Sequence, residues 1–111
     1  MRDAVHLSFV TVLALLVFTP ALALAQRSPE QRGEVLVIRH CAICHGIGRS
    51  TSSPNPNARP FRTLSATLNL ESLEEPLSKG ALFGHPMMPS FALTASEARA
   101  IVRYLQSIQD R

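Results

Sequence analysis

A continuous apolar run dominates the amino-terminal end of the chain. It covers residues 5–24, follows Arg2 and closes on Ala23-Leu24-Ala25, with only a few polar side chains within it. A basic start, an apolar stretch and small residues at an A-x-A site are typical of a secretory signal peptide. We therefore predict that residues 1–25 are a cleaved signal peptide and that residues 26–111 form the mature domain.

The same run is also about as long as the ~20 residues that span a bilayer, so a retained membrane anchor is the alternative. Pro20 and the A-x-A site favour cleavage, because proline ends an apolar helix and leaves an extended strip for the peptidase. Both alternatives place the domain outside the cytoplasm. We expect a periplasmic protein with no membrane span after signal cleavage.

The two ends of the mature domain carry helix-start signals. Ser28-Pro29-Glu30-Gln31 predicts an N-cap, a proline in the first turn and a capping box, and Thr94-Ala95-Ser96-Glu97 predicts a second box. Apolar residues follow the second box at helical spacing: Ala98, Ile101, Val102, Leu105 and Ile108. Gly33 inside the first helix costs about 1 kcal/mol relative to alanine, so we expect a close helix crossing there, beside Tyr104.

The segment between these helices shows no alternating strand pattern and no repeat. Residues 46–62 are rich in Gly, Ser, Pro, Asn and Arg, which favours turns. Residues 64–70 are ambiguous. Residues 72–79 predict a short helix if Pro76 falls in its first turn, with Gly80 as its stop. One domain is therefore expected.

The motif Cys41-Ala42-Ile43-Cys44-His45 carries the main chemical signal. C-x-x-C-H is the spacing at which two thiols bond to the vinyl groups of one haem, with the adjacent histidine as an axial iron ligand. A redox dithiol, half a zinc site or a disulfide are the alternatives. A dithiol lacks its βαβ context, and a zinc site would need further ligands from His40 and His85. We predict one covalent haem c, held through Cys41, Cys44 and His45.

Size and charge limit the remaining possibilities. A domain of this length has a marginal apolar core, and a buried haem would supply a large part of it. The net charge is +3 and aromatic residues make up only 5% of the chain. Such a balance favours acidic patches on partner proteins and is too weak and scattered to suggest nucleic-acid binding.

The sixth iron position has four candidates in the sequence, namely Met87, Met88, His85 and His40. The first three lie in His85-Pro86-Met87-Met88-Pro89-Ser90-Phe91, a segment restrained by two prolines. Core filling is the ordinary role of a methionine, and two adjacent methionines cannot both face the iron. The residues alone leave this choice open.

Taken together, the motifs resemble small bacterial monohaem class I cytochromes c over nearly all of residues 26–111. The resemblance implies an all-α, cytochrome c-like bundle of three or more short helices around one covalently bound haem, with the terminal helices crossing near Gly33 and Tyr104. In that family the methionine before the proline of a Met-Pro-x-Phe segment binds iron. It therefore implies that Met88 is the ligand and that Met87 packs.

The resemblance also concerns the surroundings of the axial histidine. Many family members carry a Gly-Pro-x-Leu segment whose proline carbonyl accepts the Nδ1 hydrogen of that histidine. Arg59-Pro60-Phe61 is the nearest equivalent here, so Pro60 is the expected acceptor and Pro54 the alternative. Among the arginines of this loop, Arg62 is the expected partner of a haem propionate, because guanidinium suits a bidentate carboxylate contact.

An iron held by His45 and Met88 has no open position for substrate, so the expected function is one-electron transfer and not catalysis. We expect transient contacts with a periplasmic dehydrogenase and with a terminal oxidase or reductase. Two alternatives stay open. One is a haem c redox subunit of an enzyme complex, and the other is a haem sensor or peroxidase-like protein with an open sixth position.

Overall fold

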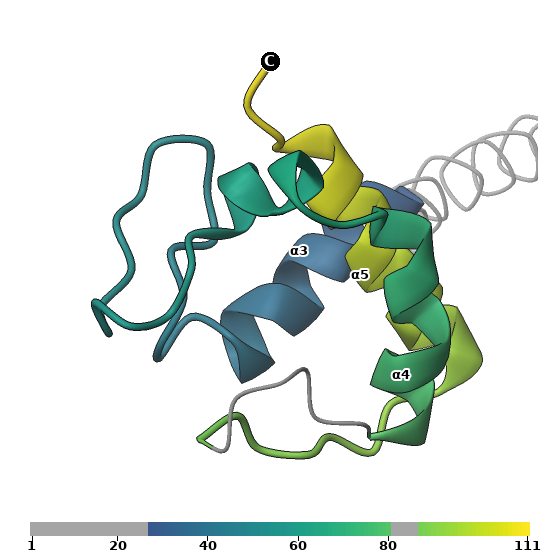
Figure 1. The fold of residues 1–111 in the computed structure, drawn as a ribbon. Helices are drawn as coiled ribbons and strands as arrows, with labels where there is room; N and C mark the ends of the chain where they lie inside the picture. The colour runs from purple at the N-terminus through teal and green to yellow at the C-terminus, as the bar shows by residue number, and fades with distance from the viewer. Residues whose placement is uncertain (1–26, 81–86) are drawn as a thin grey trace, which may run out of the picture.

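The computed structural model describes residues 27–80 and 87–111, in which all regular structure is helical. The predicted signal peptide and His85 lie outside the described residues. Figure 1 shows the elements, which are α3 (Pro29–His40), the 3₁₀ helices η1 (Phe61–Ala66) and η2 (Leu70–Leu73), α4 (Glu74–Lys79) and α5 (Ala95–Ser107). The predicted all-α class is confirmed for these residues. Within them, no helix has the length and apolar character needed to cross a membrane.

Both predicted capping boxes are present. The Gln31 amide donates to Ser28 Oγ at 3.2 Å, and the Ser28 amide donates to Gln31 Oε1 at 2.9 Å. At α5, the Glu97 amide donates to Thr94 Oγ1 at 3.1 Å and the Thr94 amide to Glu97 Oε2 at 2.8 Å. These side chains satisfy amide groups that a helix start leaves without partners. Local sequence therefore fixes where both long helices begin.

The helices α3 and α5 cross at Gly33 (Figure 1), as predicted. A Cβ atom on Gly33 would lie 1.9 Å from the Ala100 carbonyl oxygen and 2.8 Å from the Tyr104 Cβ. Neither distance is possible for real atoms, so a side chain at this position would force the helices apart. The missing side chain thus determines how closely α3 and α5 approach.

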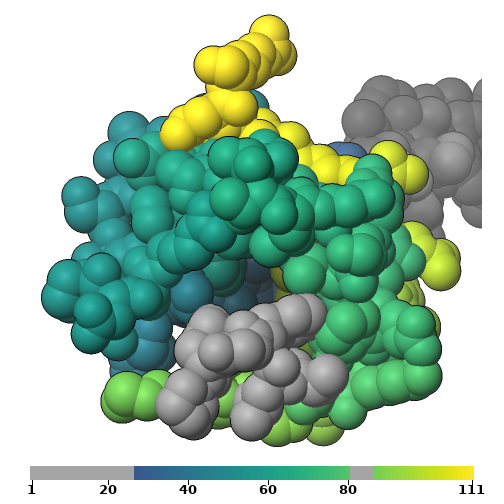
Figure 2. Space-filling view, viewed as in Figure 1, coloured from purple at the N-terminus to yellow at the C-terminus, as the bar shows by residue number. Residues whose placement is uncertain are grey.

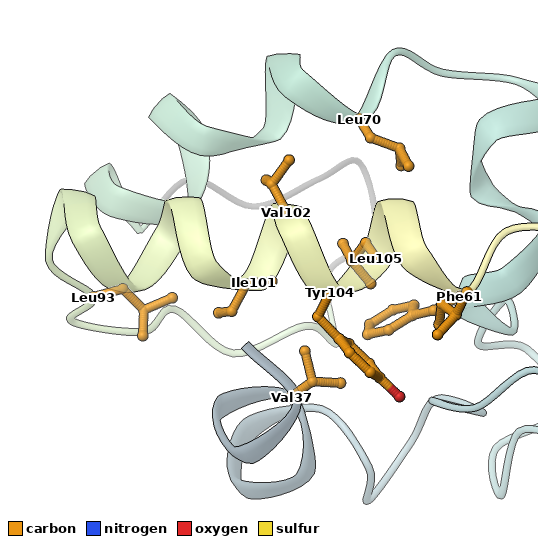
Figure 3. Packing of buried hydrophobic residues seen from close by; sticks show 9 residues of the cluster. Val37, Phe61, Leu70, Leu93, Ile101, Val102, Tyr104 and Leu105 are labelled. Carbon is orange, nitrogen blue, oxygen red and sulfur yellow. The ribbon is translucent and has the colours of Figure 1, made fainter. Parts of the chain in front are cut away.

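The apolar core is built largely from α5, with single residues from α3, η1, η2 and the loop before α5. Its buried members are Val37, Phe61, Leu70, Leu93, Ile101, Val102, Tyr104, Leu105 and Ile108. Figure 3 shows the side chains of Val37 and Phe61 directed towards Tyr104. Cys41 is partly buried against this cluster, so the core adjoins the C-x-x-C-H motif.

Between the two long helices, the structure agrees with the prediction at α4 and differs from it at η1. Pro76 falls in the first turn of α4, and Gly80 ends that helix with a left-handed φ of 67°, as predicted. The helix η1, however, begins at Phe61, inside the segment predicted to be loop. The side chain of Phe61 is buried in the core, and this tertiary contact has no periodic signal in the sequence.

Candidate haem-binding site

A cavity of about 250 Å³ lies between the C-x-x-C-H motif and the segment that carries Met88. Cys41, Cys44, His45 and Met88 all line it. The face in Figure 2 is hollowed at its centre, and blue residues of α3 are visible at depth. Residues from both ends of the domain therefore converge on one space.

The two cysteines lie directly after α3, and both are half-buried. Cys41 is the C-cap residue of α3, so the helix sets its position. Burial raises the pKa of the Cys41 thiol to about 11. Redox dithiols use a lowered pKa to provide a thiolate at neutral pH, so this environment counts against the dithiol alternative.

A zinc site receives no support from the described residues. Among residues 27–80 and 87–111, no group of three or more His, Cys, Asp or Glu side chains could hold a metal ion. Zinc sites in proteins use three or four such ligands. His40 lines the cavity, but its ring packs against Phe91 with centroids 5.2 Å apart.

Contacts with two described residues, Arg59 and Phe61, help to orient the ring of His45. Nδ1 lies 2.7 Å from the Arg59 carbonyl oxygen, and because a carbonyl only accepts, Nδ1 is the donor. The ring also stacks on Phe61, with centroids 4.5 Å apart and planes at 29°. With Nδ1 directed to this carbonyl, Nε2 is the ring nitrogen that would face a bound metal.

The prediction that the Pro60 carbonyl accepts from His45 is therefore wrong, because the acceptor is the carbonyl of the preceding residue, Arg59. Pro60 caps η1, and its carbonyl instead accepts from the Thr63 amide at 3.2 Å and from Thr63 Oγ1 at 2.9 Å. A carbonyl engaged in the first turn of a helix points along that helix, whereas the preceding Arg59 carbonyl is directed at His45. The start of η1 at Phe61, which the sequence did not reveal, causes this shift.

Arg62 is not among the residues that line the cavity. Its Nε lies 3.4 Å from Asp110 Oδ2, and its carbonyl accepts from the Asp110 amide at 2.8 Å. The carboxy-terminal end thus holds Arg62 through Asp110, and the contact of Arg62 with a haem propionate stays a prediction. Sequence reasoning also missed the polar lining residues Asn55 and Asn57, which resemble any other turn asparagine in the sequence.

The two adjacent methionines differ in exposure. Met87 is 84% exposed, whereas Met88 is half-buried, although both line the cavity. Behind them, Ser90 Oγ donates to the Gly80 carbonyl at 2.8 Å. The structure therefore favours Met88 as the methionine directed inward, and it gives Met88 a hydrogen-bonded anchor two residues away.

Comparisons with known proteins cover this whole arrangement. The family described as "Cytochrome C oxidase, cbb3-type, subunit III" matches residues 28–105, a range that includes the C-x-x-C-H motif and Met88. Cytochrome c-552 of Bradyrhizobium diazoefficiens is 27% identical over 104 residues, which are 94% of this chain and 98% of that protein. No solved structure matches the chain.

Proposed function

The chain belongs to the family described as cytochrome c oxidase, cbb3-type, subunit III, and we propose that it is an exported electron carrier whose haem iron is held by His45 and Met88. The predicted resemblance to small c-type cytochromes is confirmed, as are haem c and its iron as cofactor. A haem c electron carrier is the function of this family. The residues, compartment and partners that follow are our proposals.

We assign each iron- or haem-facing residue one role. Cys41 and Cys44 would form the thioether links, and His45 would bind iron through Nε2 while Nδ1 donates to Arg59. Met88 would complete the axial pair through its thioether sulfur. Bound haem supplies the reversible Fe(III)/Fe(II) couple. The observation that carries the proposal is that all four side chains line one cavity.

The surrounding chain would tune this couple in two ways. A thioether ligand favours the reduced iron, so Met88 would raise the reduction potential of a bound haem. The hydrogen bond from Nδ1 increases the basicity of His45 and fixes the plane of its ring, which Phe61 also supports. The folded chain forms both contacts of the His45 ring, so they would hold the imidazole in place for the iron.

Redox partners are implied for any electron carrier, and we propose that this protein meets them transiently in the periplasm. A periplasmic dehydrogenase would donate electrons, and a terminal oxidase or reductase would accept them. The net charge of +3 favours an acidic patch on the partner. The match over 98% of cytochrome c-552 supports the assignment to small c-type cytochromes.

A second candidate is a permanent redox subunit of an oxidase complex. The description of the matching family, which names an oxidase subunit, favours it. Purification under mild conditions separates the two candidates. A free carrier elutes at the mass of one chain, whereas a subunit elutes with other chains at a fixed ratio.

Carbon monoxide tests whether His45 and Met88 both bind the iron, because this ligand binds only where ferrous iron has an open or displaceable position. We expect the reduced wild-type protein to exclude carbon monoxide and the Met88→Ala variant to bind it rapidly. Stopped-flow absorption measures both rates. Rapid binding by the wild type would overturn the carrier assignment in favour of a sensor or peroxidase-like protein.

A further inference from the structure

We infer that Arg59 is a positioning residue for His45, because its guanidinium anchors the same residue whose carbonyl holds the imidazole. This inference rests on the proposed role of His45 as an iron ligand. It goes further by assigning a function to a side chain that does not touch the iron and that lies 14 positions away in the sequence.

Arg59 makes contacts through both its main chain and its side chain. Its carbonyl oxygen lies 2.7 Å from His45 Nδ1. Its guanidinium donates from Nη1 to Thr67 Oγ1 at 2.7 Å, and Nη2 lies at a longer 3.5 Å from the Thr63 carbonyl. Thr67 is the C-cap residue of η1, so the guanidinium is fixed to both the body and the end of that helix.

This anchor matters because Arg59 lies outside any helix. The following proline restricts Arg59 to extended conformations but leaves a range of ψ, and ψ sets the direction of the carbonyl. The hydrogen bond from the planar guanidinium to Thr67 costs little side-chain entropy and narrows the range of ψ at Arg59. The helix η1, itself fixed by the buried Phe61, thereby sets the direction of the hydrogen bond to His45.

The expected electronic effect has a definite sign. A hydrogen bond from Nδ1 makes the imidazole more basic, which stabilises Fe(III) and lowers the reduction potential. A loosened carbonyl should therefore raise the potential. The alternative is a purely electrostatic role, in which the positive guanidinium disfavours Fe(III). On that account only removal of the charge changes the potential, and it lowers it.

Thr67→Val separates these accounts, since it removes the nearer of the two acceptors of the guanidinium and leaves the charge of Arg59 in place. Spectroelectrochemistry of the haem-loaded protein measures the potential, and NMR measures hydrogen exchange at His45 Nδ1. We expect a higher potential and faster exchange than in the wild type. Thr51→Val is the matched control, because Thr51 Oγ1 also accepts a loop hydrogen bond, from the Gly48 amide at 2.7 Å, and it should change neither value.

Arg59→Lys provides a second variant that keeps the charge and loses the planar fork, and it should shift both values in the same direction. An unchanged or lowered potential in both variants would overturn the positioning role. Circular dichroism checks that each variant is folded. The far-red absorption spectrum of the wild type tests the proposed function separately. If the wild type lacks the iron-methionine band, the proposed function fails whatever the variants show.

Discussion

The crossing of α3 and α5 and the segment that carries Met88 are held together in different ways. At the crossing, backbone meets backbone at Gly33, and Val37 is fully buried beside it. Among the residues that the structure describes around Met88, the contacts include the hydrogen bond from Ser90 to Gly80 and the ring contact between His40 and Phe91. The crossing is thus a close approach of two backbones, whereas these described contacts near Met88 are made by side chains.

The difference follows from what each region has to contact. The crossing brings two helices into direct contact, so its geometry depends strongly on the side-chain volume at Gly33. The Met88 segment faces a cavity, and Met87 beside it is 84% exposed. Substitutions at the crossing should therefore reduce stability, whereas substitutions near Met88 should alter the spectrum and leave the helices intact.

Gly33→Ala should have the largest effect on stability. In an exposed helix this change gains about 1 kcal/mol, but here the new Cβ would meet the Ala100 carbonyl at 1.9 Å. We expect a loss of about 3 kcal/mol in the free energy of unfolding, at the upper end of the usual cost of overpacking, because the new side chain forces the helices apart. Denaturant unfolding of the haem-loaded protein measures it.

Gly48→Ala is the matched control for Gly33→Ala. A Cβ on Gly48 would approach nothing closer than Thr51 Oγ1 at 3.3 Å. We expect a change within about 1 kcal/mol, because Gly48 is half-buried and only the side chain of Thr51 would have to move slightly. Equal effects of the two substitutions would contradict the close crossing.

Tyr104→Phe should have an intermediate effect on stability, because Tyr104 links the helix crossing to the haem-site loop. The Tyr104 hydroxyl donates to the Ile47 carbonyl at 2.7 Å, which ties α5 to the loop after the haem motif. Its removal keeps the ring in the core and leaves that carbonyl without this donor, at a cost of about 1 kcal/mol. Thermal unfolding measures the loss, and an unchanged midpoint would show that the hydrogen bond contributes nothing.

Ser90→Ala should have the smallest effect on stability, below about 0.5 kcal/mol, since its hydrogen bond is exposed. It should nevertheless lower the temperature at which the iron-methionine absorption band disappears, because Ser90 anchors the segment carrying Met88. Ser78→Ala is the control, since Ser78 Oγ also donates to a carbonyl, that of Glu75, at 2.9 Å. If the iron-methionine band disappears at the same temperature in both variants, Ser90 does not anchor the segment that carries Met88.

Local patterns in the sequence predicted the ends of the helices and the position of the helix crossing well. Both capping boxes, the stop at Gly80 and the crossing at Gly33 follow from rules that involve neighbouring residues or a single missing side chain. The convergence of the C-x-x-C-H motif and Met88 was expected from the family resemblance. The structure brings both to one cavity.

The surroundings of His45 could not be predicted in the same way. The choice of Arg59 over Pro60 depends on where η1 begins, and η1 begins at a residue buried by tertiary packing. The ion pair of Arg62 with Asp110 joins positions far apart in the sequence, so no local pattern predicts it. Neither contact has a period or a spacing that sequence rules detect.

The central claim is that His45 and Met88 hold the haem iron, and far-red absorption of the oxidised mature protein tests it most directly. A weak band in this region accompanies iron-methionine coordination. We predict that the wild type and Met87→Ala show the band and that Met88→Ala loses it, with a lowered potential, since axial ligands set haem potentials over about 0.8 V. A wild type without the band, or a Met88→Ala variant that keeps it, would contradict the account.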